Sequence, residues 1–240
     1  NWVLTLREDY SGNFWVGTGA HGLIHYDRQS RQTTFLPFDT AFAKTRSGIG
    51  KTFFEDRKGN LWIGTQGEGV YFFDAVQRTF QHFDTQNSGL NRNIVNAILE
   101  DESGRIWIGT DGGGINIFDP EQKTFTHLQH QLSDANSLAS NSVYTFFKDE
   151  EGVTWIGTFD GGISILNDNR KNFQHYTVYH IPGKGLSHHS VLSFLEDRNG
   201  RIWIGTDGGG LNQFHPDEQR FSYLQHQKNE QIGRASCRER

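Results

Sequence analysis

The chain has 240 residues, a formal net charge of -5, a mean hydropathy of -0.65 and 13% aromatic residues, with 19 Phe and 6 Trp. This acidic balance argues against nucleic acid as a partner, because the phosphate backbone is bound by clustered Lys and Arg. There is no run of 18 apolar residues, so we expect this part of the protein to make no membrane contact.

One block, Gly-x-x-Trp-Ile-Gly-Thr, recurs along the chain with small variations. Its five Trp residues follow one another at intervals of 45 to 48 residues, at Trp15, Trp62, Trp107, Trp155 and Trp203. A period near 47 residues is the length of one small supersecondary unit. The chain is therefore predicted to be an array of five similar modules.

The third module shows the expected elements in chain order. The mostly apolar segment 93–100 predicts a first strand. A tight turn from Asp101 to Gly104 follows, because Asp accepts local backbone hydrogen bonds and Gly supplies a positive φ. Residues 105–110, 115–118 and 124–128 predict three more strands, separated by turns at 111–114 and 119–123. The same Asp-x-x-Gly turn recurs at residues 9–12, 56–59, 149–152 and 197–200.

Four antiparallel strands joined by short turns form a meander, which cannot bury both of its faces alone. Radial stacking of the meanders predicts an all-β fold, a β-propeller of four-stranded antiparallel blades, with each Trp between neighbouring blades. The residue ten positions before each Trp is small or β-branched, which places the first strand innermost: Thr5, Thr52, Ala97, Thr145 and Ser193. The alternative is a parallel β-solenoid. It is disfavoured because solenoid repeats lack the three hairpin signals per period that this sequence shows.

The repeat resembles a known family. Its pattern is Glu-Asp-x-x-Gly-x-Leu/Ile-Trp-Ile-Gly-Thr-x-x-Gly-Gly-Leu/Ile, followed by Phe/Tyr-Asp. This pattern is similar to the two-component regulator propeller repeat, in five in-phase copies over about residues 1–228. It lacks the Gly-His and Trp-Asp pairs of WD repeats, and its Gly pair is placed differently from that of kelch repeats.

The resemblance implies the periplasmic sensor domain of a hybrid two-component histidine kinase of the Bacteroidetes type. It implies an oligosaccharide ligand, regulation of glycan-utilisation genes, and a homodimeric parent with a second propeller and an Ig-like domain. Because the family's rings have seven blades, five blades imply an open arc, and the alternative is a closed ring of five. The expected blades cover about residues 1–38, 48–84, 93–130, 141–176 and 189–226.

The C-terminal segment 232–240 reads Ile-Gly-Arg-Ala-Ser-Cys-Arg-Glu-Arg and contains Cys237, the single cysteine. It resembles a translated sequencing-adapter read-through. We therefore expect it not to be native protein, and the alternative is an ordinary basic tail.

Function is expected where the modules differ. In such a propeller, the turns between second and third strands and the connections between blades open on one face. Carboxylates, amides and imidazoles beside aromatic rings suit sugar hydroxyls. The alternative is structural, since Asp-Gly-Gly is also a tight-turn sequence. The predicted ligand-binding residues are His21, Gln66, Glu68, Arg92, Asn93, Asp111, Asn141, Phe159, Asp160, His188, His189 and Asp207.

Phe159 is the only aromatic residue in the five Thr-x-x turns. It is interpreted either as a sugar-stacking platform or as a residue that packs against the next blade's connection.

We predict no metal site and no cofactor. His188 and His189 are adjacent, and adjacent strand residues point to opposite faces, so they are not expected to bind one ion together. His127 and His130, on a strand and its exit, are interpreted as structural or surface residues. The acidic residues Asp111, Asp160 and Asp207 are separated by the rotation between blades, which argues against a shared cation.

The leading functional prediction is a non-catalytic ligand-sensing module without catalytic residues. One alternative is a structural or dimerisation propeller that transmits a signal without binding ligand. Another is a propeller enzyme similar to lyases or quinone-dependent dehydrogenases. An enzyme needs an acid or base that breaks the repeat pattern in the central funnel. His189 is the nearest candidate, because modules three and four carry Asn at its position.

Overall fold

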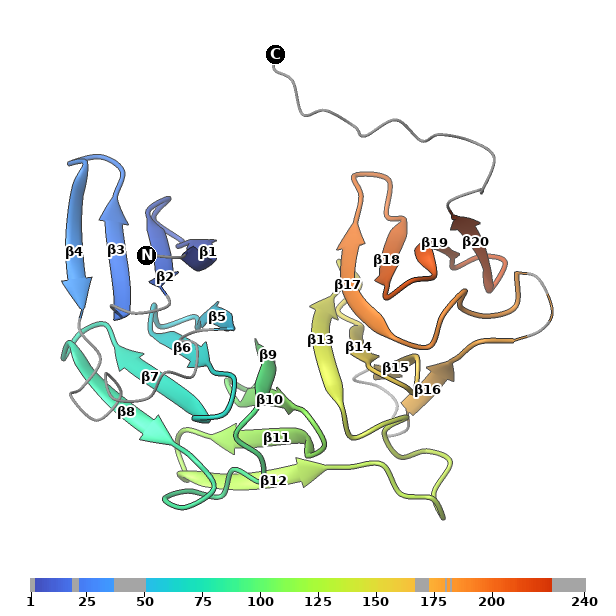
Figure 1. The fold of residues 1–240 in the computed structure, drawn as a ribbon, viewed down its shortest axis with the longest axis horizontal. Helices are drawn as coiled ribbons and strands as arrows, with labels where there is room; N and C mark the ends of the chain where they lie inside the picture. Colours follow the sequence, from blue (N-terminus) through green and yellow to red (C-terminus); the bar gives the residue numbers. More distant parts are fainter. Residues whose placement is uncertain are drawn as a thin grey trace.

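The structure, a computed structural model, describes residues 3–18, 22–36, 51–166, 173–179, 181 and 183–225. Within these residues, five four-stranded antiparallel sheets form an arc (Figure 1). The strands of each sheet follow one another in chain order, so each sheet is a meander. The predicted all-β propeller fold is confirmed. His21 and the segment 232–240 lie outside the described residues.

The strands of the five blades have the following bounds. Blade 1 contains β1 (Val3–Glu8), β2 (Phe14–Thr18), β3 (Gly22–Asp27) and β4 (Gln32–Leu36). Blade 2 contains β5 (Thr52–Glu55), β6 (Leu61–Gly64), β7 (Val70–Asp74) and β8 (Thr79–Phe83). Blade 3 contains β9 (Val95–Glu100), β10 (Ile106–Thr110), β11 (Gly114–Asp119) and β12 (Thr124–Leu128). Blade 4 contains β13 (Val143–Lys148), β14 (Thr154–Thr158), β15 (Ile163–Leu166) and β16 (Phe173–Tyr176). Blade 5 contains β17 (Val191–Glu196), β18 (Ile202–Thr206), β19 (Gly210–His215) and β20 (Arg220–Leu224).

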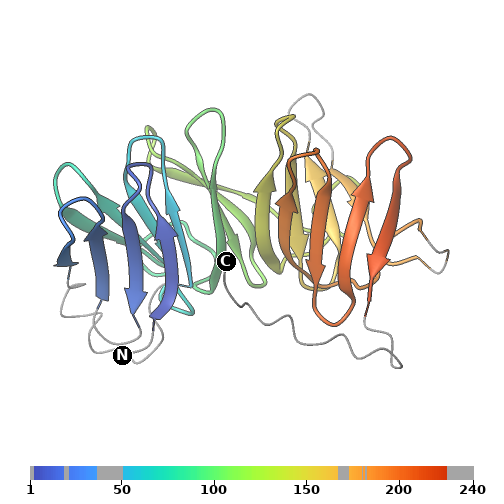
Figure 2. The same ribbon diagram turned by 90° about the horizontal axis from the view of Figure 1, so that it is seen from above.

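The first strand of each blade lies innermost, as the small residues of the repeat predict. Neighbouring first strands contact one another in the order β1, β5, β9, β13 and β17, and the fourth strands form the outer rim (Figure 1). The arc stays open between blade 1 and blade 5, and the view from above shows the same gap (Figure 2). No helix in the described part of the chain is long and apolar enough to cross a lipid bilayer.

The repeat Trp residues lie between blades. In the first four blades the Trp ring packs against an aromatic ring of the next blade, at centroid distances of 5.3 to 6.4 Å. The pairs are Trp15 with Phe73, Trp62 with Phe118, Trp107 with Phe146, and Trp155 with Phe214. Aromatic pairs at these distances add to the gain from burying the rings.

The Asp of each Asp-x-x-Gly turn holds the Trp in place. In blade 3, Asp101 Oδ1 accepts two backbone N–H bonds of its own turn at 2.9 Å, and Oδ2 accepts the indole N–H of Trp107 at 3.1 Å. In blade 1, Asp9 Oδ2 meets His25 Nε2 at 2.9 Å, and the His25 ring packs against Trp15. The indole bond recurs at Asp56 with Trp62, Asp149 with Trp155, and Asp197 with Trp203.

These bonds make stability depend on pH. Burial raises the pKa of Asp101, but hydrogen bonds from Arg105 and from the Trp107 indole outweigh it and leave the pKa below its ordinary value. A carboxylate whose pKa is lowered by folding stabilises the fold above its unfolded pKa of about 3.9 and loses that contribution as the pH falls. We expect Asp101→Asn to lose less stability than the parent chain between about pH 6 and pH 3. Urea unfolding at both pH values measures this, and equal acid losses would contradict it.

The Gly and Thr of the block also have fixed roles. A Cβ atom on Gly109 would lie only 2.6 Å from Val143 Cγ1 of the next blade, so this position has no room for a side chain. Thr110 Oγ1 donates to Gly114 O at 3.1 Å and closes the turn between β10 and β11. The same Thr bond closes this turn in blades 2, 4 and 5.

The two ends of the arc expose surface that the inner joints bury. Val3 of blade 1 is 63% exposed, whereas the equivalent Val95 of blade 3 is fully buried. On blade 5, Leu195 and Leu224 are exposed, and Trp203 is only partly buried. Each end therefore presents one half of a blade-to-blade joint.

Candidate ligand-binding site at the propeller axis

The turns between second and third strands lie against the connections that enter the blades, as the strand order predicts. In blades 3, 4 and 5 the first turn residue donates its backbone N–H to the connection at 3.0 Å. The bonds run from Asp111 to Ile94, from Phe159 to Ser142, and from Asp207 to Ser190. We call this side of the arc the connection face.

In blades 1, 3, 4 and 5 the innermost strand carries a β-bulge at the residue eleven positions before the repeat Trp. The pairing of β13 with β14 skips Tyr144, which is the extra residue of the bulge. In β1, β9 and β17 the same irregularity falls on Leu4, Asn96 and Leu192. In blade 2, Lys51 occupies this position, and its N–H bonds Gly64 O at 2.7 Å. A bulge redirects a side chain, and here it does so on the strand nearest the axis.

The residues at this position in blades 2, 3 and 4 lie close together on the inner side of the arc. Lys51 Nζ donates to Asn96 Oδ1 at 2.6 Å, and Asn96 Nδ2 donates to Val143 O at 2.8 Å. The same ammonium lies 5.3 Å from the ring centroid of Tyr144. Burial lowers the pKa of Lys51, and the carboxylate of Asp111 partly offsets this. Three chemically different side chains from equivalent repeat positions therefore lie close together.

Phe159 extends this group onto the connection face. Its ring stacks on Tyr144 at 5.3 Å with an interplanar angle of 25°, and 45% of the residue is exposed. Burial raises the pKa of Tyr144, and the carboxylates of Asp111 and Asp207 raise it further. Tyr144 therefore remains a neutral phenol. Its ring, in the same blade as Phe159, supports the Phe159 ring. We call Lys51, Asn96, Tyr144, Phe159 and Asp111 the axial cluster.

Serines of one connection hold two predicted carboxylates. Ser142 Oγ donates to Asp111 Oδ1 at 2.8 Å, and Ser140 Oγ donates to Asp160 Oδ1. Arg92 is exposed and donates to Asn91 O at 2.8 Å. Across the described part of the chain, no three His, Cys, Asp or Glu side chains gather closely enough to hold a metal ion.

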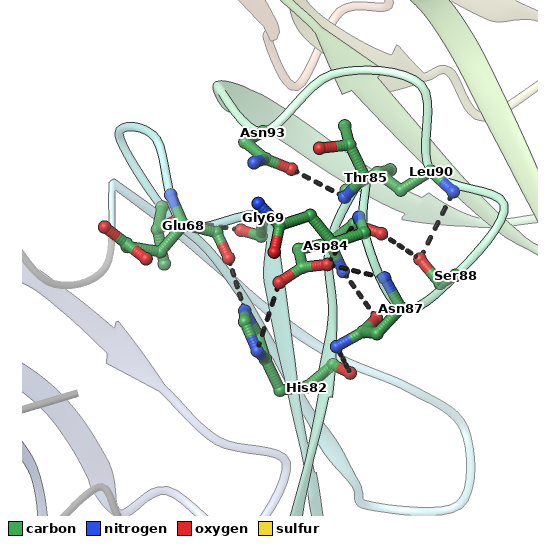
Figure 3. Close-up of polar contacts among 11 residues, drawn as sticks. Glu68, Gly69, His82, Asp84, Thr85, Asn87, Ser88, Leu90 and Asn93 are labelled. Atoms are coloured by element: carbon green, nitrogen blue, oxygen red, sulfur yellow. Dashed lines mark hydrogen bonds and ion pairs between the residues drawn. The ribbon is translucent and has the colours of Figure 1, made fainter. Parts of the chain in front are cut away.

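Asn93 and Asn141 have their side-chain oxygens occupied within the chain. Asn93 Oδ1 accepts the N–H of Thr85 at 2.9 Å, while its backbone carbonyl accepts the N–H of Gly69 (Figure 3). Asn141 Oδ1 accepts the N–H of His130 at 2.7 Å in the same way. These bonds make the first strand of blade 3 start at Val95 instead of residue 93, because the two preceding residues bond to the turn of blade 2.

Gln66 and Glu68 lie in that turn of blade 2. His82 contacts the carbonyl of Glu68 and stacks on Tyr71, and the amide of Asn87 bonds the carbonyl of His82 at 3.1 Å (Figure 3). The His82 ring thus holds the backbone carbonyl of Glu68 in place. Gln66 is exposed and bridges the connection to blade 3. No contact joins Gln66 or Glu68 to the axial cluster among the described interactions.

His188 and His189 differ from the prediction that they point to opposite faces. Their rings stack at 4.3 Å with an interplanar angle of 24°. They precede β17, which begins at Val191, so strand alternation does not apply to them. His188 Nδ1 accepts the N–H of Ser190 at 3.1 Å, which gives this ring a role in the connection. As interpreted, His127 and His130 bond backbone carbonyls, those of Gly89 and Leu138.

Buried polar side chains anchor the connections. Asn116, on the third strand of blade 3, is fully buried, and its Oδ1 accepts the N–H of Asn91 at 3.0 Å. Ser164 accepts from Ala139 and Asn212 accepts from Ser187 at the equivalent places.

We expect Asn116→Ala to lower the free energy of unfolding by about 1–2 kcal/mol, because the N–H of Asn91 loses its acceptor. Hydrogen exchange at the Asn91 amide should accelerate, while exchange at the Ser187 amide, held by Asn212, stays unchanged. Equal acceleration at both amides would contradict a local anchor.

Lys51, Asn96 and Tyr144 were not predicted as site residues from the sequence. The signal was present, because the position eleven residues before each Trp reads Leu, Lys, Asn, Tyr and Leu in the five modules. The bulge that turns this position toward the axis has no marker of its own, so the residue reads as an ordinary strand position.

Four segments of the chain match the family model described as two component regulator propeller: residues 47–67, 89–112, 137–160 and 185–208. Each segment runs from the connection to the turn after the second strand, which is the part of the blade nearest the axis. No curated protein matches the chain.

Several solved structures are similar. The extracellular domain of a putative hybrid two component system from B. thetaiotaomicron is 27% identical with a TM-score of 0.79, over 94% of this chain and 29% of that chain. Another such domain from B. thetaiotaomicron is 24% identical with a TM-score of 0.68, over 95% and 31%. The chain thus spans less than a third of these structures. A virginiamycin B lyase from Staphylococcus aureus, 9% identical with a TM-score of 0.65 over 91% and 69%, shares the fold alone.

Proposed function

The chain carries two component regulator propeller repeats, and from this premise we propose that it is the non-catalytic, ligand-sensing part of a hybrid two-component sensor kinase. The 27% identical relative is an extracellular domain of a putative system of this kind, which supports a periplasmic location for this part. The proposal includes an oligosaccharide ligand and control of glycan-utilisation genes. It also includes a homodimeric parent with a second propeller and an Ig-like domain.

The observation that carries the ligand role is the contrast between scaffold and axis. The repeat Trp, Gly, Thr and Asp make equivalent contacts from blade to blade. The bulge positions on the innermost strands differ in chemistry, with an ammonium, an amide and a phenol at Lys51, Asn96 and Tyr144. A purely structural ring needs no such differences, whereas a binding site does.

The chemistry of the axial cluster suits a sugar. Phe159 offers an exposed aromatic ring for the apolar face of a pyranose. The carboxylate of Asp111 accepts hydrogen bonds from hydroxyls, and the ammonium of Lys51 donates to them. A ligand that contacts blades 2, 3 and 4 at once would favour one relative arrangement of these blades. Such a shift in conformational population could transmit a signal.

The exposed end faces favour a structural role as a second candidate. Val3 and Leu6 on blade 1, and Leu195 and Leu224 on blade 5, are each more than 60% exposed. We infer that further blades of the same repeat pack on these faces and complete a ring of seven. The enzyme alternative has less support, because His189 is exposed and stacks on a neighbouring His instead of lining an enclosed funnel.

The test is titration of the chain with neutral hexasaccharides, for example xylohexaose, mannohexaose and arabinohexaose, and with a galacturonan hexamer. Binding to the native state raises the melting temperature and gives a calorimetric affinity. We expect at least one sugar to bind, and Tyr144→Ala to weaken it. Tyr10→Ala, on the exposed Asp-x-x-Gly turn of blade 1, is the matched control with unchanged affinity. If no member of the panel binds, the structural role is favoured.

A further inference from the structure

The joint between blades 4 and 5 lacks a clamp that the preceding joint has. Between blades 3 and 4, the first turn residue is Asp111, and its carboxylate accepts the hydroxyl of Ser142 in the following connection. One module later, the equivalent residues are Phe159 and Ser190. The serine is kept, but Phe159 has no acceptor for it.

The hydroxyl of Ser190 is consequently left without a partner. Ser190 is 2% exposed, and its Oγ is one of two buried side-chain polar atoms without a hydrogen bond in the described part of the chain. The other is Asn91 Oδ1, on the amide whose Nδ2 bonds Gly113 O at 2.8 Å. An unmade hydrogen bond on a buried group costs roughly 1–3 kcal/mol.

Two unfavourable features therefore coincide at one turn position. The joint carries an unpaired hydroxyl at Ser190 and an exposed aromatic ring at Phe159. In the preceding module, Asp111 takes the place of Phe159 and pairs with the equivalent serine, so neither feature is present. Local choices that lower stability without a structural gain are typical of binding sites. Phe159 is thus set apart from the other turn residues by its energetic cost as well as by its chemistry.

The surroundings of Phe159 are acidic. Asp160 follows it in the same turn, Asp111 belongs to the preceding turn, and Asp207 occupies the equivalent position of blade 5. Among the described residues, Lys51 contacts the Tyr144 ring but is already bonded to Asn96, and Arg92, beside the turn of blade 3, is bonded to the carbonyl of Asn91. In the part of the chain that the structure describes, these three carboxylates outnumber the two engaged cations and disfavour an acidic ligand, because like charges in a partly desolvated site repel.

We propose that Phe159, supported by Tyr144, is the stacking platform of the connection face and that it selects a neutral sugar ring over a uronic acid. This inference rests on the proposed oligosaccharide-sensing function. The free face of Phe159 takes the apolar face of the ring, and the carboxylates of Asp160 and Asp207 accept its hydroxyls. Specificity comes from these carboxylates, which reject a sugar carboxylate.

The decisive variant is Phe159→Asp, which rebuilds the Asp–Ser clamp of the preceding joint. We expect a higher melting temperature, because Ser190 gains an acceptor, and a loss of neutral-oligosaccharide affinity of roughly ten-fold or more. Phe159→Ala should lose the affinity without the gain in melting temperature. Ser190→Ala should keep the affinity, since it removes only the unpaired hydroxyl. Phe35→Ala, at an equally exposed aromatic residue of blade 1, should change neither the affinity nor its selectivity.

The outcomes separate the two proposals. Wild-type affinity in both Phe159→Asp and Phe159→Ala overturns the platform. If the galacturonan hexamer binds the parent chain as tightly as the neutral hexasaccharides, the selectivity is overturned while oligosaccharide sensing stands. If no sugar of either class binds, the sensing function fails, and this inference fails with it.

Discussion

Replacement of Trp107 by Ala should lower the free energy of unfolding by about 3–5 kcal/mol, the range for truncation of a buried Trp. The Trp107 ring is 6% exposed and packs against Phe146 of blade 4, and its indole N–H bonds Asp101. In a repeat array, stability is approximately a sum of module terms and nearest-neighbour interface terms. The substitution removes both the indole bond and most of one interface.

Trp203→Ala is the matched control. Its indole bonds Asp197 at 3.0 Å, close to the 3.1 Å of the Trp107 bond, but no blade within the described residues covers its ring on the far side. We expect a loss of only about 1–2 kcal/mol, because less apolar surface is already buried there. Urea unfolding of both variants measures the difference, which isolates the interface term. Equal losses would show that the Trp acts within its own blade.

Much of the fold could be predicted from the sequence because each repeat residue has a local physical signature. The Asp-x-x-Gly turns predict hairpins, and the interval between Trp residues gives the length of a blade. Small residues such as Ala97 predicted the innermost strand, since they pair with the Gly of the block where two blades converge. These signals depend on backbone conformation and close approach, which a single sequence reveals through Gly, Asp and Trp.

The axial cluster could be predicted only in part. Phe159 and Asp111 were identified from their place in a turn, and the structure brings both near the axis. Tyr144 was missed because a β-bulge decides which way it points, and this bulge depends on pairing between strands. Lys51 was missed because it lies at the equivalent position just before β5, where nothing in the sequence marks it. The unpaired hydroxyl of Ser190 was also invisible, since it follows from a residue in another blade.

Two other predicted site residues also make hydrogen bonds within the chain. The side-chain oxygens of Asn93 and Asn141 accept backbone N–H groups of the preceding connections. A single sequence does not tell a polar residue that caps a connection from one that contacts a ligand, because both roles need the same acceptor atoms. At the same position of blade 5, the His189 ring stacks on His188, and its backbone carbonyl accepts the N–H of Gly162.

Gly109→Ala should be strongly destabilising, at the upper end of roughly 1–3 kcal/mol for overpacking of a filled joint. The added Cβ would lie 2.6 Å from Val143 Cγ1 and 3.0 Å from Phe146 Cζ, both in the next blade. Neither neighbour can move easily, because Val143 is fully buried between the blades. The innermost strands must therefore separate, which also displaces Tyr144, the residue that supports Phe159. We expect a fall in ligand affinity together with the loss of stability.

Gly205→Ala tests whether the cost comes from the neighbouring blade. Gly205 occupies the same place in blade 5, but its added Cβ would meet Ser193 Oγ at 2.5 Å and nothing else closer than 3.8 Å. The Ser193 side chain can rotate away, so we expect a loss below about 1 kcal/mol. The difference between the two urea midpoints then measures how tightly one blade closes on the next. A cost at Gly205 equal to that at Gly109 would mean that the Gly is needed for strand geometry within its own blade. The close approach of neighbouring blades would then depend on Val143 and its equivalents alone.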